Sequence, residues 1–345
     1  YEQSGVSIDA NDAMVGRIGR SLHSTYGPRV MPLKNGFAGL FRLDYDEKLF
    51  KRNYKNPVLV ACTDGVGTKI LIAQKVGRFR TVGIALVAMG VNDMLVLGAE
   101  PLFFRDYLAV QKLDPATIAA MVESVARGCR LAGCALLGGE TAEMPDLYGS
   151  DEYDMAGFGV GVVERKRIID GKSVQKGDVI LGLASSGLHS NGFSLVRHIC
   201  FKKEKLDVRR PMAELSGALL GDVLLEPTRI YVPSIIKLLA SYKVKKVVHG
   251  MAHITGGGMY GNVIRVIPKG LDIDIDFRSW ERPKIFDLIQ SAGIEEDEMR
   301  KVFNLGIGYV FIVDPDEVHL IEGALSGSGE SIVRIGRVVK CTSRA

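Results

Sequence analysis

Apolar segments separated by short polar turns run through the first half of the chain and predict an alternation of strands and helices. Strand patterns are found at residues 58–61, 102–110, 135–137 and 153–163, and helix patterns at 70–76 and 115–131. The helix at 115–131 is the clearest, because Pro115 stands in its first turn and apolar residues follow at helical spacing. Residues 82–97 are apolar or small throughout except for Asn92 and Asp93. The uniformly apolar segment 58–61 predicts a buried strand.

The second half of the chain shows a similar mixture of patterns. Strand patterns are found at residues 178–184, 271–277, 300–314 and 331–340, and a helix-like pattern at 193–199. A basic cluster at residues 164–167 separates the two halves, and residues 1–40 are interpreted as a mobile arm. We therefore predict an α+β fold with two domains, residues 1–166 and 167–345, each a mixed sheet with packed helices.

Charge and composition narrow the function classes. The net charge is only +4, and the basic clusters at 164–167 and 243–246 lack interleaved aromatic residues, so nucleic acid is not an expected partner. The longest apolar run, residues 82–91, is too short to span a membrane, and no leader pattern is found. The five scattered cysteines form no CxxC pair. We expect reduced thiols, a cytoplasmic protein and no structural zinc site.

The turn TDGVGTK at residues 63–69 has the composition of a phosphate site. It fails the P-loop template, because Lys69 is not followed by Ser or Thr, and it fails the dinucleotide fingerprint, because Ile70 replaces the third glycine. Asp64, at the end of the predicted strand, has the wrong charge to meet phosphate directly. A magnesium ion between the carboxylate and the phosphate would solve this problem. A glycine-containing turn with a capping aspartate is an equally simple interpretation.

Further polar residues within apolar segments favour the metal interpretation. Asn92 and Asp93 interrupt an apolar segment, where burial costs free energy unless the two side chains have partners. Glu140 follows a predicted buried strand in the same way. If Asp64, Asp93 and Glu140 converge, they form an oxygen-rich site suited to Mg²⁺ and ATP.

A rival interpretation rests on Gly256-Gly257-Gly258-Met259-Tyr260-Gly261, which matches the G-x-G-x-x-G fingerprint of dinucleotide-binding oxidoreductases. Acidic residues follow at 272, 274 and 276, near the position of a ribose-binding carboxylate. However, Pro268 limits the next helix to residues 260–267, which is too short for the crossover helix. The alternating aspartates also fit the wet face of a strand.

His189 and His253 lie in loops rich in Ser, Thr and Gly that precede helix-like segments. Such loops offer backbone N–H groups to a phosphate monoester, and histidine exchanges protons near neutral pH. The alternative is that each histidine caps or fills a turn. The matching settings of the two side chains favour a role in substrate binding or proton transfer.

Eight motifs in order resemble the phosphoribosylformylglycinamidine cyclo-ligase family, also called aminoimidazole ribonucleotide synthetases. The motifs are YEQSGVSIDA (1–10), TDGVGTK (63–69), LVAMGVND (86–93), GAEPLFFRDY (98–107), GGETAEMP (138–145), ASSGLHSNGFSLVR (184–197), EPTRIYV (226–232) and HITGGG (253–258). They extend over nearly the whole chain. The resemblance implies an ATP-dependent ligase of purine biosynthesis, in which the formyl oxygen of a phosphoribosyl amidine is phosphorylated and an amidine nitrogen then closes the imidazole ring.

The resemblance also implies site residues. The residues for Mg²⁺ and ATP are Asp64, Gly65, Gly67, Thr68, Lys69, Asn92, Asp93, Glu140 and Thr141, with Asp64, Asp93 and Glu140 as metal ligands. The residues for the ribotide are His189, Ser190, Asn191, Thr255, Gly256, Gly257 and Gly258. The proton acceptor in ring closure is His189 or His253, with Asp93 beside the chemistry. Family dimers pair their N-terminal sheets into a barrel, which implies a homodimer here.

One segment departs from the family pattern. The glycine-rich flap of the family corresponds here to residues 31–39, which hold fewer glycines and an added Pro32; Lys34 is a candidate phosphate contact there. Three alternatives share the architecture or the nucleotide. A selenophosphate synthetase is disfavoured because the first cysteine is Cys62. A thiamine monophosphate kinase is not expected to carry the HSNG and HITGGG loops, and a nucleotide sensor would release no ADP.

Overall fold

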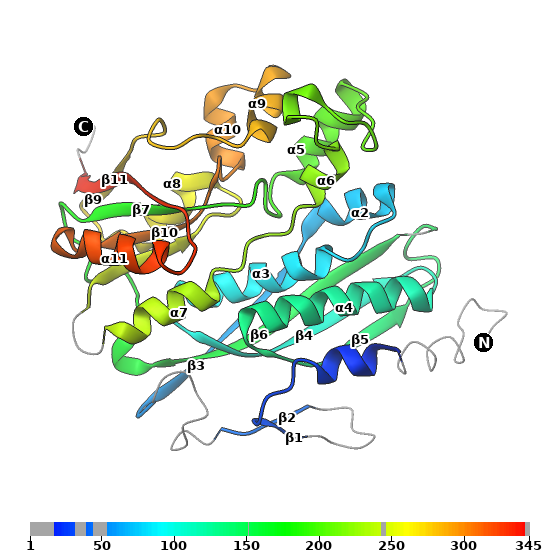
Figure 1. Cartoon of the computed structure of the whole chain (residues 1–345), viewed down its shortest axis with the longest axis horizontal. Helices are drawn as coiled ribbons and strands as arrows, with labels where there is room; N and C mark the ends of the chain where they lie inside the picture. The colour runs from blue at the N-terminus through cyan, green and yellow to red at the C-terminus, as the bar shows by residue number, and fades with distance from the viewer. Residues whose placement is uncertain (1–16, 32–38, 44–53, 151, 243–245, 342–345) are drawn as a thin grey trace.

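Two β-sheets, each built from one half of the chain, organise the fold, with helices between and around them (Figure 1). The computed structural model describes residues 17–31, 39–43, 54–150, 152–242 and 246–341. Pro32, Lys34 and most of the predicted N-terminal arm lie outside the described residues. Among the described residues, no helix combines the length and hydropathy that a membrane span requires.

The first sheet has the order β3-β6-β4-β5. Its strands are β3 (Pro57–Gly65), β4 (Glu100–Val110), β5 (Ala135–Glu143) and β6 (Tyr153–Glu164). β4 and β5 are parallel and the other pairs antiparallel, so the predicted mixed sheet is confirmed here. Helices α3 (Val82–Leu95) and α4 (Pro115–Ala132) cover one face of this sheet (Figure 1).

Helix α3 explains the long apolar segment of the sequence. It contacts α4, the first sheet, and α7 and β8 of the second half, so it is enclosed on all sides. Every residue of α3 except Asp93 is buried. The helix therefore lies at the junction of the two halves, and Asp93 is its single partly open position.

Two sequence expectations about the first sheet are wrong. β3 is an edge strand in which partly buried and exposed positions alternate, and Leu59 is 56% exposed, so this strand is not buried as predicted. The strand predicted at 135–137 extends to Glu143, which places Glu140 inside the strand rather than after it. Pairing with β4 continues the strand past its apolar residues.

The second sheet has the order β8-β10-β7-β11-β9. Its strands are β7 (Val179–Ala184), β8 (Val248–His253), β9 (Leu271–Ile275), β10 (Ile307–Val313) and β11 (Ile332–Lys340). All the pairings in this sheet are antiparallel, so the predicted mixed sheet is wrong for the second half. Residues 300–302, predicted as strand, belong to helix α10 (Glu296–Val302), whose acidic first turn and basic last turn suit a helix.

The remaining elements are a separate two-stranded sheet, formed by β1 (Val30–Met31) and β2 (Leu40–Phe41), and shorter helices. These helices are α2 (Ile70–Val76), α5 (Phe193–Arg197), α6 (Leu220–Leu225), α7 (Val232–Ser241), α8 (Gly258–Val263), α9 (Lys284–Ser291) and α11 (Val318–Ser326). The predicted helix at 70–76 is confirmed. The predicted boundary at 166/167 falls in a 3₁₀ turn, Arg165–Arg167, between the last strand of the first sheet and the first strand of the second.

One apolar core extends across both halves of the chain. It joins residues of α3 and α4 to residues of β7, α5 and α7, and Val66 of the TDGVGTK turn belongs to it with 1% of its surface exposed. A second, smaller cluster lies between the other face of the second sheet and α8. The shared core holds the end of β3 against the loops of the second half, where the candidate site lies.

Candidate active site

Asp64 and Asp93 form an acidic pair where β3 meets α3. Burial raises the pKa of Asp64, a hydrogen bond from the Gly65 backbone N–H (2.7 Å) opposes this shift, and the charge of Asp93 adds to it. Burial and the same two carboxylates raise the pKa of the Cys62 thiol to about 12, so this cysteine is a packing residue. Two adjacent oxygen ligands whose charges repel one another fit a hard divalent cation.

His253 links this pair to the second half of the chain. Its Nδ1 lies 2.7 Å from Asp93 Oδ1, and its side chain is 1% exposed whereas that of Asp93 is 41% exposed. Asp93 is acceptor-only when ionised, so the proton of neutral His253 is on Nδ1. Nε2 is therefore left as a proton acceptor.

Asn92 supports the same assignment. Its Nδ2 donates to the Arg229 carbonyl (2.8 Å), and its Oδ1 accepts from the Tyr231 N–H (3.2 Å), so the amide orientation is fixed. The amide nitrogen lies 3.5 Å from His253 Nε2. Because a donor faces Nε2, this nitrogen carries a lone pair.

His189 has a different environment. Its backbone has a φ of 60°, its side chain is buried, and its Nε2 accepts a hydrogen bond from the Ser186 N–H (3.2 Å). Its Nδ1 is buried and has no hydrogen-bond partner among the residues that the structure describes. Burial, followed by His253, Lys69 and Arg229, holds its pKa well below the usual value. His189 is therefore neutral, and its one basic nitrogen is already in use.

The glycine-rich loop after β8 is held from within by Asn262. The amide of Asn262 donates to the carbonyls of Thr255 (3.2 Å), Gly256 (3.2 Å) and Gly258 (2.7 Å). Gly258 has a φ of 64°, and a Cβ there would lie 1.8 Å from a carbonyl oxygen of α10, so only glycine fits. These three hydrogen bonds turn the loop carbonyls inward and hold the loop in this conformation.

Asn191 brings the two predicted substrate loops together. Its Oδ1 lies 3.7 Å from where a Cβ of Gly256 would stand, and its Nδ2 is buried with no partner in the described part of the chain. Ser190 is engaged by Thr228, with 2.8 Å between the hydroxyl oxygens. A buried amide donor that lacks a partner in the protein fits a ligand oxygen.

Several of the predicted nucleotide contacts have other partners in the protein or lie away from the acidic pair. Lys69 is fully buried, and its ammonium donates to backbone carbonyls of the second half. Thr68 lies 3.3 Å from Ser194, between the hydroxyl oxygens. Glu140 is paired with Tyr107 in the sheet, beyond two intervening strands from Asp64, about 14 Å away at ordinary strand spacing.

The sheet faces separate Glu140 further from the acidic pair. Tyr107, beside Glu140, is 39% exposed on the face opposite the helices, and neighbours across strands share a face. Asp64 alternates with the exposed Thr63 and faces α3. The three predicted metal ligands therefore do not converge within one chain, and no group of three acidic, His or Cys side chains in the described residues is placed to hold a metal. Thr141 follows Glu140 in β5 and is equally remote.

Sequence reasoning missed three residues that shape this site. Asn262 had only its position after a glycine run as a signal, and Tyr231 only its place in the EPTRIYV motif. Gly308 had no signal at all; a Cβ there would lie 2.2 Å from the Tyr231 hydroxyl and 2.4 Å from the His189 ring. These roles depend on contacts between distant segments.

Comparisons with known proteins follow the same division of the chain. The family model described as AIR synthase related protein, N-terminal domain, matches residues 48–163, and the corresponding C-terminal domain model matches residues 175–344. The phosphoribosylformylglycinamidine cyclo-ligase of Geotalea daltonii is 51% identical over 342 residues, covering 99% of this chain and 95% of that protein.

Two solved structures share the fold. Thiamine-monophosphate kinase from Stenotrophomonas maltophilia has a TM-score of 0.67 at 17% identity, covering 95% of this chain and 93% of that one. Hydrogenase maturation protein HypE in complex with ATP has a TM-score of 0.63 at 16% identity, covering 96% and 85%. At these identities the likeness concerns the fold alone.

Proposed function

The chain belongs to the phosphoribosylformylglycinamidine cyclo-ligase family, and from this premise we propose how its residues perform the reaction. It is an enzyme that cyclises formylglycinamidine ribonucleotide to aminoimidazole ribonucleotide with ATP, releasing ADP and phosphate. ATP phosphorylates the formyl oxygen. The amidine nitrogen then forms the new C–N bond as the C–O bond to phosphate breaks, and the nitrogen loses a proton.

His253 is the proton acceptor. Its Nε2 carries the lone pair because Asp93 accepts the Nδ1 proton, and the Asn92 amide that faces this nitrogen lies 3.5 Å away, at the limit of a hydrogen bond and longer than the 3.2 Å bond to His189. His189 is excluded from this role by its bond from Ser186. A positioned histidine of this kind contributes about 10²–10⁴-fold to the rate.

Asp64 and Asp93 would hold Mg²⁺. When bound, this ion neutralises charge on the ATP phosphates. The repulsion that contributes to the raised pKa of Asp64 supports this assignment, because a cation between the carboxylates would relieve it. In HypE the bound nucleotide is ATP, and we extend this ligand to the present chain.

The ribotide lies against the two loops that meet at Asn191. The unpartnered Nδ2 of Asn191 and the backbone of Gly256 and Gly257 bind its phosphate. Asn262 keeps the loop carbonyls away from this anion. Ser190 and Thr255 support the loops from either side.

The enzyme is a homodimer in the cytoplasm. The face of the first sheet opposite α3 and α4, which Phe41 covers in part at Phe103, exposes Leu59, Tyr107 and Phe158 at 56%, 39% and 42%, and pairing of two such faces would cover them. Glu140 lies at that face and reaches a nucleotide only as a group of the other chain, whereas Thr141 pairs with the buried Leu108 on the opposite face.

The single observation that carries the mechanism is the 2.7 Å contact of His253 Nδ1 with Asp93 Oδ1, beside Asp64. The test is an ADP-release assay with formylglycinamidine ribonucleotide, thiamine monophosphate and selenide as separate substrates. We expect ADP only with the ribotide, together with a diazotisable aminoimidazole. ADP release with another substrate, or none with the ribotide, would overturn the proposed function.

A further inference from the structure

Lys69 belongs to the first half of the chain, and its side chain reaches the second half. Its Nζ donates to the His189 carbonyl (2.6 Å) and to the Glu226 carbonyl, and it lies 5.4 Å from the centroid of the Phe193 ring. The residue has no exposed surface. It follows Asp64 within the same turn, so one short segment carries both a metal ligand and this bridge.

The environment of Lys69 is unusual for a cation. Its two hydrogen bonds go to backbone carbonyls rather than to a carboxylate. Burial lowers its pKa to about 7, and the nearby charge of Glu226 only partly opposes this shift. Burying a charged amino group costs free energy. Lys69 therefore contributes to the site through the two backbone segments that its hydrogen bonds hold in place.

The two hydrogen bonds from Lys69 hold the segment of His189 and the segment that begins at Glu226. His189 has a φ of 60°, a backbone conformation that residues other than glycine rarely adopt. Its ring lies 6.4 Å from that of His253, between centroids. Glu226 is the first residue of a segment to which Asn92 is hydrogen-bonded, through the Arg229 carbonyl and the Tyr231 N–H.

We propose that Lys69 is a positioning residue for ring closure, which fixes the His189–Asn191 loop against the segment 226–231. It thereby presets the ribotide-binding groups beside the turn that carries Asp64. This role replaces the phosphate contact predicted from the sequence, and it rests on the proposed function. It acts through backbone carbonyls, so its loss displaces the loop rather than removing a ligand contact.

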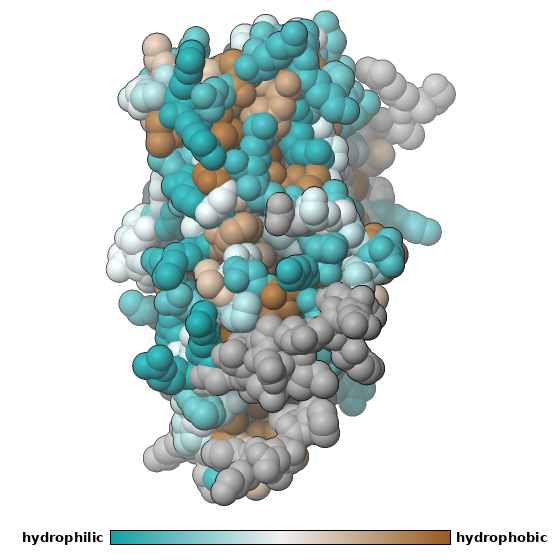
Figure 2. Space-filling model, turned by 90° about the vertical axis from the view of Figure 1, so that its right-hand side faces the viewer, coloured by the Kyte–Doolittle hydropathy of each residue, from teal (hydrophilic) through white to brown (hydrophobic). Residues whose placement is uncertain are grey.

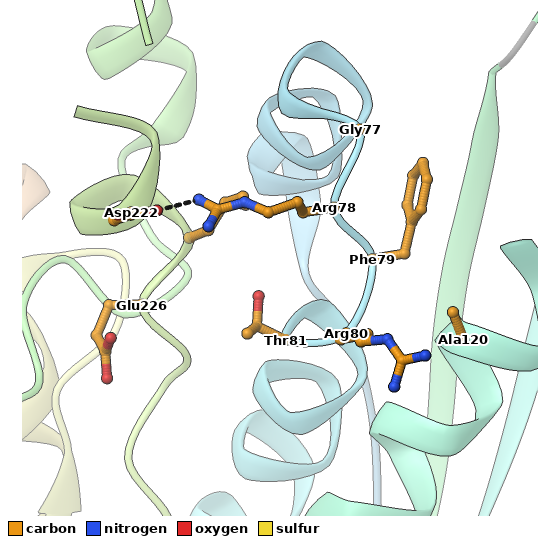
Figure 3. A pocket seen from close by; sticks show the side chains of 9 residues that line it. Gly77, Arg78, Phe79, Arg80, Thr81, Ala120, Asp222 and Glu226 are labelled. Atoms are coloured by element: carbon orange, nitrogen blue, oxygen red, sulfur yellow. Dashed lines mark hydrogen bonds and ion pairs between the residues drawn. The ribbon is translucent and has the colours of Figure 1, made fainter. Parts of the chain in front are cut away.

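A second bridge between the same halves provides a matched control. Arg78, in the turn after α2, pairs with Asp222 of α6, and both side chains are about half exposed, at 50% and 47%. Figure 3 shows this pair at a pocket of about 510 Å³, with Glu226 on the wall opposite Thr81. The side of the molecule that carries α2 and α6 shows small hydrophobic patches separated by hydrophilic residues (Figure 2). Replacing Arg78 weakens contact between the halves without touching the His189 loop.

The experiment compares Lys69→Met, Lys69→Gln and Arg78→Gln in the full-length protein. Wild-type enzyme must first release ADP only with the ribotide; if it does not, the proposed function fails rather than this inference. The measured quantities are kcat and the separate KM values for ribotide and ATP, with amide hydrogen exchange of residues 186–192.

We expect Lys69→Met to raise the ribotide KM at least about tenfold and to speed exchange in that loop, with the ATP KM changed less than about twofold. Lys69→Gln, which retains a donor, should recover much of the loss and also serves if the Met variant does not fold. Arg78→Gln should match wild type. A raised ATP KM in both Lys69 variants would establish a phosphate contact instead. An equal defect in Arg78→Gln, or unchanged ribotide KM in Lys69→Met, would overturn the proposal.

Discussion

At the scale of single residues, the amide of Asn92, which faces His253 Nε2, helps to decide which nitrogen of that histidine is basic. Asn92 is bound at both ends by backbone groups of the second half, so its amide cannot rotate. Asp93 fixes the other side of the same ring. The order Asn92-Asp93 in α3 therefore favours one tautomer of a histidine far away in the sequence.

This arrangement separates the roles of the two histidines. We expect His253→Gln to lower kcat by about 10²–10⁴-fold, because the proton acceptor is lost. His189→Gln should act chiefly on the ribotide KM, because that side chain is held by Ser186. Steady-state kinetics at saturating ATP measure both. A kcat loss in His189→Gln that equals the loss in His253→Gln would contradict the assignment.

Gly308 lies where the protein has no room for a Cβ atom. A Cβ there would lie 2.2 Å from the Tyr231 hydroxyl and 2.4 Å from the His189 ring. Gly308→Ala should destabilise the protein by about 1–3 kcal/mol, because the surrounding core must shift. Gly323→Ala is the control: it lies in helix α11 with nothing within 4 Å of the added Cβ, and it should stabilise by up to about 1 kcal/mol. Urea unfolding of both variants measures the difference. Equal stability of Gly308→Ala and wild type would show that the site has room.

At the scale of elements, helix α10 supports the glycine-rich loop. The Arg300 carbonyl packs directly against Gly258. The start of α10 is fixed by Glu296, which accepts hydrogen bonds from Arg282 (2.9 Å), Gln290 (2.9 Å) and Arg300 (2.7 Å). The loop conformation therefore depends on a charged cluster at a neighbouring helix.

The pH dependence of stability tests this cluster. The hydrogen bond from Arg282 is the main cause that lowers the pKa of Glu296 from 4.5 to about 2. A carboxyl with a depressed pKa stabilises the fold above its unfolded pKa, and the contribution is lost as the pH falls toward 2. Between pH 4.5 and pH 3, wild type should lose more unfolding free energy than Glu296→Gln, as measured by urea unfolding. Glu298→Gln, in the same turn, should keep the wild-type slope. Parallel curves for wild type and Glu296→Gln would refute this role.

Elements with a strong local pattern could be predicted from the sequence, whereas side-chain directions could not. Helices α2 and α4 have the predicted limits within a residue, because their apolar spacing and their proline or glycine ends are local signals. The direction of Glu140 depends on strand register and on an irregularity in the pairing of β4 and β5. The direction of Lys69 depends on carbonyls of loops far away in the sequence.

At the scale of the whole molecule, the first sheet has two unlike faces. One face is covered by α3 and α4 and leads to Asp64 and Asp93, and the other exposes Leu59 and Phe158. Glu140 belongs to the exposed face. If the carboxylates predicted from the sequence share one nucleotide, two chains must supply them.

Subunit mixing tests this arrangement directly. Asp64→Asn and Glu140→Gln homodimers should each be nearly inactive, because every site lacks one carboxylate. In a mixed dimer, one site receives both substitutions and the other receives neither, since Asp64 and Glu140 of that site come from different chains. Random exchange makes about half of the dimers mixed, so activity should return to about a quarter of wild type. The two variants are mixed, partly unfolded and refolded, and the ADP-release assay measures the recovered activity. The control is Phe158→Asp, which should prevent dimer formation, as measured by sedimentation. If both carboxylates served one chain alone, mixing would restore nothing, and the partner's contribution would be excluded.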